Sequence, residues 1–185
     1  MHAKVKTPTP AETVDPAVRT VRANYRAEFI SGRYNGHLHL AMTMTLGLGV
    51  IALCVYWLKS PSLLEWLTIP ATFLYANFAE WAGHKYAMHR PVKGLGFMYK
   101  RHSLQHHRFF TENNMQIDST TDFKAVLLPV GIVGAFLVAF FIPVGVFLTW
   151  LFSLNVALLL IITGMAYYLS YELIHLSYHL KQDHW

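Results

Sequence analysis

The stretch "LHLAMTMTLGLGVIALCVYWLKSPSLLEWLTIPATFLYANFAEWA", residues 38–82, contains two long apolar runs that only "KSPS" at residues 59–62 separates. A helix needs about 20 residues to cross the ~30 Å hydrocarbon core of a bilayer, because it rises about 1.5 Å per residue. Residues 38–58 and 63–82 each meet that length. The stretch therefore predicts two membrane-spanning helices joined by a tight hairpin.

A second pair of apolar runs follows in the C-terminal half of the chain. Residues 125–142 form a third candidate span, and a fourth begins near residue 151 and continues past residue 170. We interpret "PVGVFLTW", residues 143–150, as a short apolar turn between them. Hydrophobic residues make up 54% of the chain and charged residues 14%, against about 25% charged in a soluble domain. The expected fold is an all-α integral membrane protein with four transmembrane helices in two hairpins.

The basic residues indicate how this protein is oriented. Six of the 15 Lys and Arg precede the first span, seven lie in residues 83–124, and Lys181 follows the fourth span, which leaves only Lys59 on the other side. By the positive-inside rule, both termini and a histidine-rich helical cap, residues 83–124, should be cytoplasmic. We expect a multi-pass protein of the bacterial inner membrane or an ER-type membrane. Because topology accounts for the basic residues, we expect no nucleic acid partner.

The N-terminal region divides into two parts. Residues 1–16 are polar and contain proline, which predicts a disordered tail. In residues 17–36, apolar residues such as Val18, Tyr25 and Phe29 recur at helical spacing with arginines between them. This pattern predicts an amphipathic helix at the membrane interface, although a soluble amphipathic helix fits it nearly as well. Residues 37–185 form the membrane domain.

Seven of the 11 histidines fall into three groups, "HKYAMH" at residues 84–89, "HSLQHH" at 102–107 and "HLSYH" at 175–179. The predicted topology brings all three to the cytoplasmic mouth of one bundle. Residues four apart share a face of an α-helix, whereas residues five apart diverge by about 140°. We therefore expect two adjacent metal ions rather than one. The predicted ligands are His84, His89, His102, His106, His107, His175 and His179.

The chemistry of the donors narrows the choice of metal. Imidazole binds Zn, Cu, Fe and Ni, and the single cysteine, Cys54, lies inside an apolar run and offers no thiolate site. Glu80 and Glu172 lie near the histidines and could accept a hydrogen bond from a ligand histidine, but a plain interfacial carboxylate is an equal alternative. For His37 and His39 we expect a surface or interfacial role.

The three histidine motifs resemble successive boxes of the fatty acid hydroxylase and sterol desaturase superfamily, over residues 71–180. This resemblance implies a non-haem centre of two iron ions, for which zinc is a possible substitute, with the seven histidines as ligands. It also implies dioxygen as oxidant, a separate electron-transfer protein as partner, and a long-chain lipid substrate, such as a fatty acid or sterol. The implied reaction is hydroxylation or desaturation at an unactivated C–H bond.

The sequence departs from this family in one respect. The family pattern continues into a fourth box of the form His-x2–3-His-His, whereas this chain ends "LKQDHW", in which His184 stands alone. We therefore expect the membrane hydroxylase domain to be C-terminally incomplete. The alternatives are an inactive truncated homologue and a non-catalytic metal-binding or metal-transport membrane protein. A transporter should carry its ligands near mid-membrane, whereas these histidines gather at one end.

Overall fold

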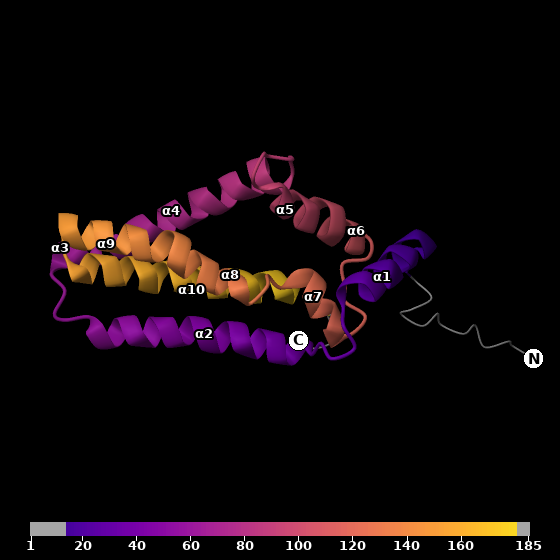
Figure 1. Ribbon diagram of the computed structural model, residues 1–185, viewed down its shortest axis with the longest axis horizontal. Helices are drawn as coiled ribbons and strands as arrows, with labels where there is room; N and C mark the ends of the chain where they lie inside the picture. The colour runs from indigo at the N-terminus through magenta and orange to yellow at the C-terminus, as the bar shows by residue number, and fades with distance from the viewer. Residues whose placement is uncertain (1–13, 181–185) are drawn as a thin grey trace, which may run out of the picture.

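The computed structural model describes residues 14–180, and all the regular secondary structure in this range is helical, apart from one isolated bridge between Thr111 and Asn114. The expected all-α fold is therefore confirmed. Among the described residues, three helical segments are long and apolar enough to cross a membrane. They are α2 (Gly36–Trp57), the segment Thr120–Leu151, and α10 (Leu154–His179), and Figure 1 shows them running along the length of the molecule.

Helices α2 and α10 pack closely because a glycine of α2, Gly47, lies where the two helices contact. A Cβ at Gly47 would lie 2.7 Å from Cδ2 of Leu169 on α10, so a larger side chain could not occupy this contact without displacing the leucine. By contrast, a Cβ at Gly49, Gly131 or Gly134 would meet nothing within 4 Å. Close helix contact therefore depends on Gly47.

The second apolar run, residues 63–82, forms two helices, α3 (Leu63–Trp66) and α4 (Thr68–Ala82). Ser62 and Glu65 form a capping box at the start of α3, and α4 packs along α10. The loop after α2 contacts the start of α10 at this end of the molecule. The Lys59 N–H donates to Oδ1 of Asn155, in the first turn of α10, and Asn155 Nδ2 donates to the Lys59 carbonyl, at 3.1 and 2.9 Å.

The predicted turn at residues 143–150 is wrong. Helix α8 (Gly131–Phe136), the π-helix η4 (Leu137–Phe141) and α9 (Ile142–Leu151) follow one another without a gap, and the turn lies at Phe152 and Ser153. Pro143 lacks an N–H but occupies the first turn of α9, directly after the π-helical turn, where proline is tolerated. Proline was therefore a poor signal for a turn here.

The segment Thr120–Leu151 does lose its regular helical structure at a different proline, Pro129. The 3-10 helix η3 (Thr120–Asp122) and α7 (Phe123–Val126) end at Leu127, whose backbone is extended, and α8 begins only at Gly131. Pro129 lies in the gap. The third predicted span, residues 125–142, is thus interrupted near its start.

The N-terminal helix α1 (Pro16–Phe29) is shorter than the predicted 17–36 and packs on the histidine-rich cap. Asp15 caps its first turn. Arg22, expected on a polar face, is only 1% exposed and donates to the carbonyls of Phe109 and Asn114 while pairing with Asp118. Most of the predicted tail, and His184, lie outside the described residues.

The cap is completed by η1 (Gly83–Met88), α5 (Gly96–Tyr99), η2 (Lys100–His106) and α6 (His107–Phe109).

Candidate metal centre

Two π-helical turns bring together histidines that are five residues apart. A π-helix closes with i→i+5 hydrogen bonds, so residues five apart lie one above the other. The His107 N–H accordingly bonds the His102 carbonyl at the end of η2, and the two Nε2 atoms lie 3.0 Å apart. In and after η1, the Nε2 atoms of His84 and His89 lie 2.9 Å apart. The predicted divergence of these pairs is wrong, because it assumed α-helical geometry.

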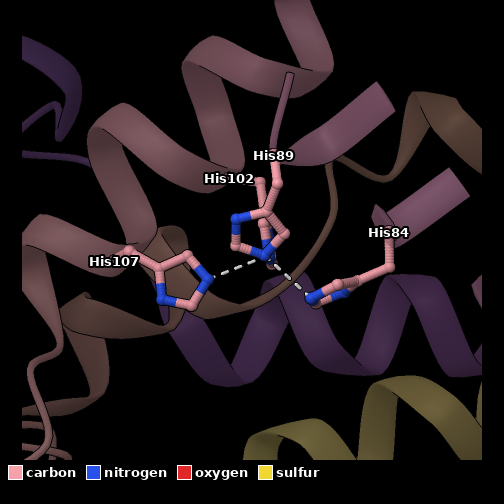
Figure 2. Close-up of side chains that lie close together, drawn as sticks. All are labelled: His84, His89, His102 and His107. Atoms are coloured by element: carbon pink, nitrogen blue, oxygen red, sulfur yellow. Dashed lines mark hydrogen bonds between the residues drawn. The ribbon is translucent and has the colours of Figure 1, made fainter. Parts of the chain in front are cut away.

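The two pairs form one group, which we call the four-histidine cluster: His84, His89, His102 and His107. One ligand nitrogen from each lies within 4.8 Å of the others. Figure 2 shows the four rings converging from η1 and η2. The rings of His84 and His102, which belong to different π-helices, have centroids only 4.6 Å apart. The cluster therefore joins two segments of the cap.

The remaining predicted ligands, His106, His175 and His179, form a three-histidine cluster. His175 and His179 share a face of α10, as their spacing of four residues predicts, with ring centroids 5.2 Å apart. His106 approaches from η2 and places its Nε2 3.3 Å from the Nε2 of His175. This cluster therefore connects the cap to the C-terminal end of α10.

The two clusters adjoin. The His106 ring lies 5.5 Å from that of His102 and 5.6 Å from that of His107, measured between centroids. The structure thus brings all seven predicted histidines together. It divides His102 from His106, which we expected to share a centre because they are four residues apart.

Backbone carbonyls fix the orientation of two rings in the three-histidine cluster. Nδ1 of His106 lies 3.0 Å from the Ala125 carbonyl, and Nδ1 of His179 lies 2.7 Å from the Met115 carbonyl. A carbonyl only accepts hydrogen bonds, so each Nδ1 carries the proton and each Nε2 keeps a free lone pair. Histidines that bind metals are usually held in this way.

The interruption of the helical segment at Pro129 leaves one of these two carbonyls, that of Ala125, without a helical partner. Around it, side chains take the places of helical partners: Arg101 donates to the carbonyls of Lys124 and Leu127, and His39 donates to that of Leu128. His39 is therefore a buried structural residue and not an interfacial one. The sequence analysis missed the roles of Arg101 and His39, and Pro129 was the signal that could have revealed them.

Neither predicted carboxylate bonds a histidine within the described residues. Glu172 is 1% exposed and its Oε2 accepts the Leu128 N–H at 3.1 Å, while its Oε1 has no hydrogen-bond partner in this part of the chain. Glu80 accepts a hydrogen bond from the Tyr167 hydroxyl at 2.5 Å. Glu172 thus supports the opened helix next to His106 and does not orient a ligand directly.

Burial disfavours the charged form of four imidazoles in the cap, those of His84, His102, His106 and His107. Burial is the main cause that lowers the pKa of both His102 and His106 to about 3, and the neighbouring histidines contribute to this shift. Burial also lowers the pKa of His84 and His107. A metal ion binds only the neutral imidazole, so these groups need not lose protons at neutral pH before they bind one.

The donor set and its geometry fit a metal ion. Nitrogens about 2.0–2.1 Å from one ion lie about 2.9–3.4 Å apart at octahedral or tetrahedral angles. The three closest Nε2 pairs, at 2.9, 3.0 and 3.3 Å, match that range. Four imidazoles can close a site, whereas three leave a position open, as in catalytic zinc centres.

Two cavities of different character meet at the histidines. A groove of about 920 Å³ with both polar and apolar walls lies between α4 and α10, and Asn77, Glu80 and Tyr167 are among its polar lining residues. An apolar groove of about 530 Å³ lies between α8 and the cap, and Met98, Ala135 and Ala139 line it. The residues that line both are His102, His106, Tyr171 and His175. A ligand in either groove would touch the centre.

Comparisons with protein-family models, with curated proteins and with solved structures gave no match.

Proposed function

We propose that this protein is a membrane-bound, non-haem di-iron oxygenase that hydroxylates or desaturates a long-chain lipid. It would use dioxygen and electrons from a separate electron-transfer protein. The observation that carries the proposal is the convergence of seven histidines into two adjoining clusters at one end of apolar helices. Bound iron would supply the redox chemistry that an unactivated C–H bond requires, which amino-acid side chains lack.

The residues of the chain have distinct roles in this proposal. The four-histidine cluster would hold one ion with a full set of imidazoles, and the three-histidine cluster would hold the second while leaving a position open. The backbone bonds to Nδ1 of His106 and His179 keep their Nε2 atoms available as ligands. Zinc fits the same donors, so the identity of the metal needs direct analysis.

The apolar groove supports a lipid as the substrate. Its walls are mostly hydrocarbon, and one side is formed by Ile132, Ala135, Phe136 and Ala139 in the segment Thr120–Leu151, a candidate membrane span. Ala135, Phe136 and Ala139 are exposed on that segment. A hydrocarbon chain could therefore enter sideways from the bilayer and reach the histidines without crossing water.

We also propose that α4 crosses the membrane as a fourth span and that the histidine clusters face the cytoplasm. Two observations support this. The loop that follows α2 contacts the first turn of α10 at one end of the molecule, through Lys59 and Asn155, whereas the cap that carries most of the histidines lies away from that end (Figure 1). Fourteen of the 15 Lys and Arg belong to the regions assigned to the cytoplasmic side.

Metal analysis of the purified chain in lipid nanodiscs tests the proposal. We expect two ions per chain after loading with Fe²⁺ under anaerobic conditions. The pair His84→Ala and His107→Ala should remove one ion, and the pair His175→Ala and His179→Ala should remove the other. His37→Ala, at an exposed histidine outside both clusters, is the matched control and should leave two.

A lipid-oxidation assay completes the test. The loaded chain, supplied with a chemical reductant, dioxygen and membrane lipids, should produce hydroxylated or unsaturated lipid, and each double variant should not. Two bound ions without oxidation would favour the alternative of a non-catalytic metal-binding protein. A wild-type chain that binds less than one ion would contradict the proposal altogether.

A further inference from the structure

A missing backbone N–H shapes the metal centre. In an α-helix, the N–H of residue 129 would bond the carbonyl of Ala125, four residues earlier. Residue 129 is proline, which has no N–H. The Ala125 carbonyl therefore loses its helical partner in the interior of the protein, where an unpaired backbone group is costly.

His106 provides the replacement partner. Its Nδ1 lies 3.0 Å from this carbonyl, and both residues are buried. The bond leaves Nε2 of His106 directed at Nε2 of His175, 3.3 Å away. The carbonyl that proline frees is thus the group that sets both the tautomer and the direction of a predicted ligand.

Other side chains hold the opened segment in this position. The Leu128 N–H, which would bond Lys124 in a helix, donates instead to Glu172 at 3.1 Å, and Arg101 donates to the Lys124 carbonyl at 3.1 Å. His39 donates to the Leu128 carbonyl at 3.0 Å and accepts a hydrogen bond from the Tyr34 hydroxyl at 2.7 Å. These bonds come from helices α2 and α10 and from the cap, so the opening is fixed from several sides.

We propose that Pro129 is a positioning residue of the metal centre. By withholding one N–H, it reserves the Ala125 carbonyl for His106 and keeps the Nε2 of that histidine free for the three-histidine cluster. The inference rests on the proposed function for its metal, but the tautomer of His106 is a property of the metal-free chain. An experiment can therefore contradict the proposed function without contradicting the role of Pro129, and the reverse also holds.

Pro143 offers a matched control in the same helical segment. It also lacks an N–H, but it follows the π-helical turn η4 and lies in α9, which Figure 1 shows away from the cap helices α5 and α6. If proline acted only by bending a membrane helix, replacing either residue should have similar effects on the centre. If the freed carbonyl matters, only Pro129 should be sensitive.

The first test replaces Pro129→Ala, which restores the N–H and allows the helix to close on Ala125. We expect Co²⁺ titration of the chain in nanodiscs, followed by absorbance, to show affinity at the three-histidine cluster falling by about 10- to 100-fold, the usual effect of losing a group that holds a ligand. The four-histidine cluster should be unaffected. Pro143→Ala should bind as the wild type does.

The second test reads the tautomer directly. Nitrogen NMR of ¹⁵N-histidine-labelled, metal-free chain, with His106→Gln to assign the signal, should show the proton of His106 on Nδ1 in the wild type and in Pro143→Ala. In Pro129→Ala this preference should be lost. An unchanged tautomer in Pro129→Ala would overturn the proposal, whether or not the wild-type chain binds metal.

A third variant separates the missing N–H from the proline ring and covers a failure of Pro129→Ala to fold. Replacement of Pro129 by the α-hydroxy acid analogue of alanine gives an ester, which has neither ring nor N–H. We expect the ester variant to keep the proton of His106 on Nδ1. Where the wild type binds Co²⁺, the affinity of the ester variant for Co²⁺ should stay within about threefold of the wild-type value, because the contribution of a single hydrogen bond varies by about that much with its surroundings. Loss of the tautomer in the ester would show that ring shape matters and would overturn the proposal.

Discussion

Burial sets the chemistry of the individual imidazoles in this protein. His102 and His106 lie inside the cap with other histidines around them, and burial lowers the pKa of each to about 3. An unfolded histidine has a pKa of about 6.5. Between these values the unfolded chain binds protons that the folded chain excludes, so acid favours unfolding in this range.

The metal-free chain should therefore lose stability as the pH falls. The contribution of His102 and His106 is fully present above about pH 6.5 and declines steadily toward about pH 3. Thermal unfolding at pH 7.5 and pH 5, followed by circular dichroism, should show a clear drop in Tm for the wild type. The drop should shrink in the double variant His102→Gln and His106→Gln, and should stay unchanged in His37→Gln. Equal drops in all three would mean that these two histidines do not couple folding to protons.

At the scale of whole elements, the packing of α2 on α10 depends on one glycine. A Cβ at Gly47 would lie 2.7 and 2.9 Å from the two methyl carbons of Leu169, which is buried. Gly49 lies one half-turn further along α2 with nothing within 4 Å of a Cβ. A larger side chain is therefore excluded at Gly47 but has room at Gly49.

Gly47→Ala should destabilise the protein by about 1–3 kcal/mol, the usual cost of overpacking a core contact. Gly49→Ala should be neutral or should stabilise by up to about 1 kcal/mol, because alanine is the better helix former. The free energy of unfolding, measured by denaturant titration in mixed micelles, compares the two. Equal effects would show that the helices approach each other elsewhere.

The apolar groove gives a prediction about the binding of a lipid hydrocarbon chain. Ala139 lines it, whereas the neighbouring Val138 is 69% exposed and does not. Ala139→Trp should fill the space of two or more methylene groups, each worth about 0.8 kcal/mol, and so weaken chain binding by about tenfold or more. Fluorescence titration with parinaric acid, a conjugated fatty acid, measures this on metal-free protein. Val138→Trp introduces the same side chain outside the groove and should bind parinaric acid as the wild type does. A similar loss of affinity in Val138→Trp would show that the hydrocarbon chain binds elsewhere.

Sequence alone predicts some of these elements well and others badly, for physical reasons. Long uncharged runs can only be buried or in lipid, so the all-helical fold with long apolar segments was predictable. The spacing of His84 and His89 could not show that they meet, because that depends on whether the turn is α- or π-helical. Pro143 and Pro129 look alike in the sequence. Their different outcomes depend on partners such as Arg101 and Glu172, which only the tertiary structure brings to Pro129.

At the scale of the whole molecule, the two ends have different characters. One end carries the contact between Lys59, in the loop after α2, and Asn155, in the first turn of α10. The other carries both histidine clusters and the docked helix α1, where Arg22 and Arg26 pair with Asp118 and Asp122 of the cap. This difference between the ends is the basis of the proposed orientation, in which the basic end faces the cytoplasm.

Cysteine labelling of intact cells tests that orientation and the crossing by α4 together. In a Cys54→Ala background, which removes the single native cysteine, Ser60→Cys and Phe152→Cys place thiols in the two loops, and Val92→Cys places one in the cap. All three positions are exposed. A membrane-impermeant maleimide should label the two loop positions from outside, because they share one end, and should reach Val92→Cys only after the membrane is broken. If α4 does not cross, the thiol at residue 92 will react from outside together with that at residue 60, and the four-span arrangement will be wrong.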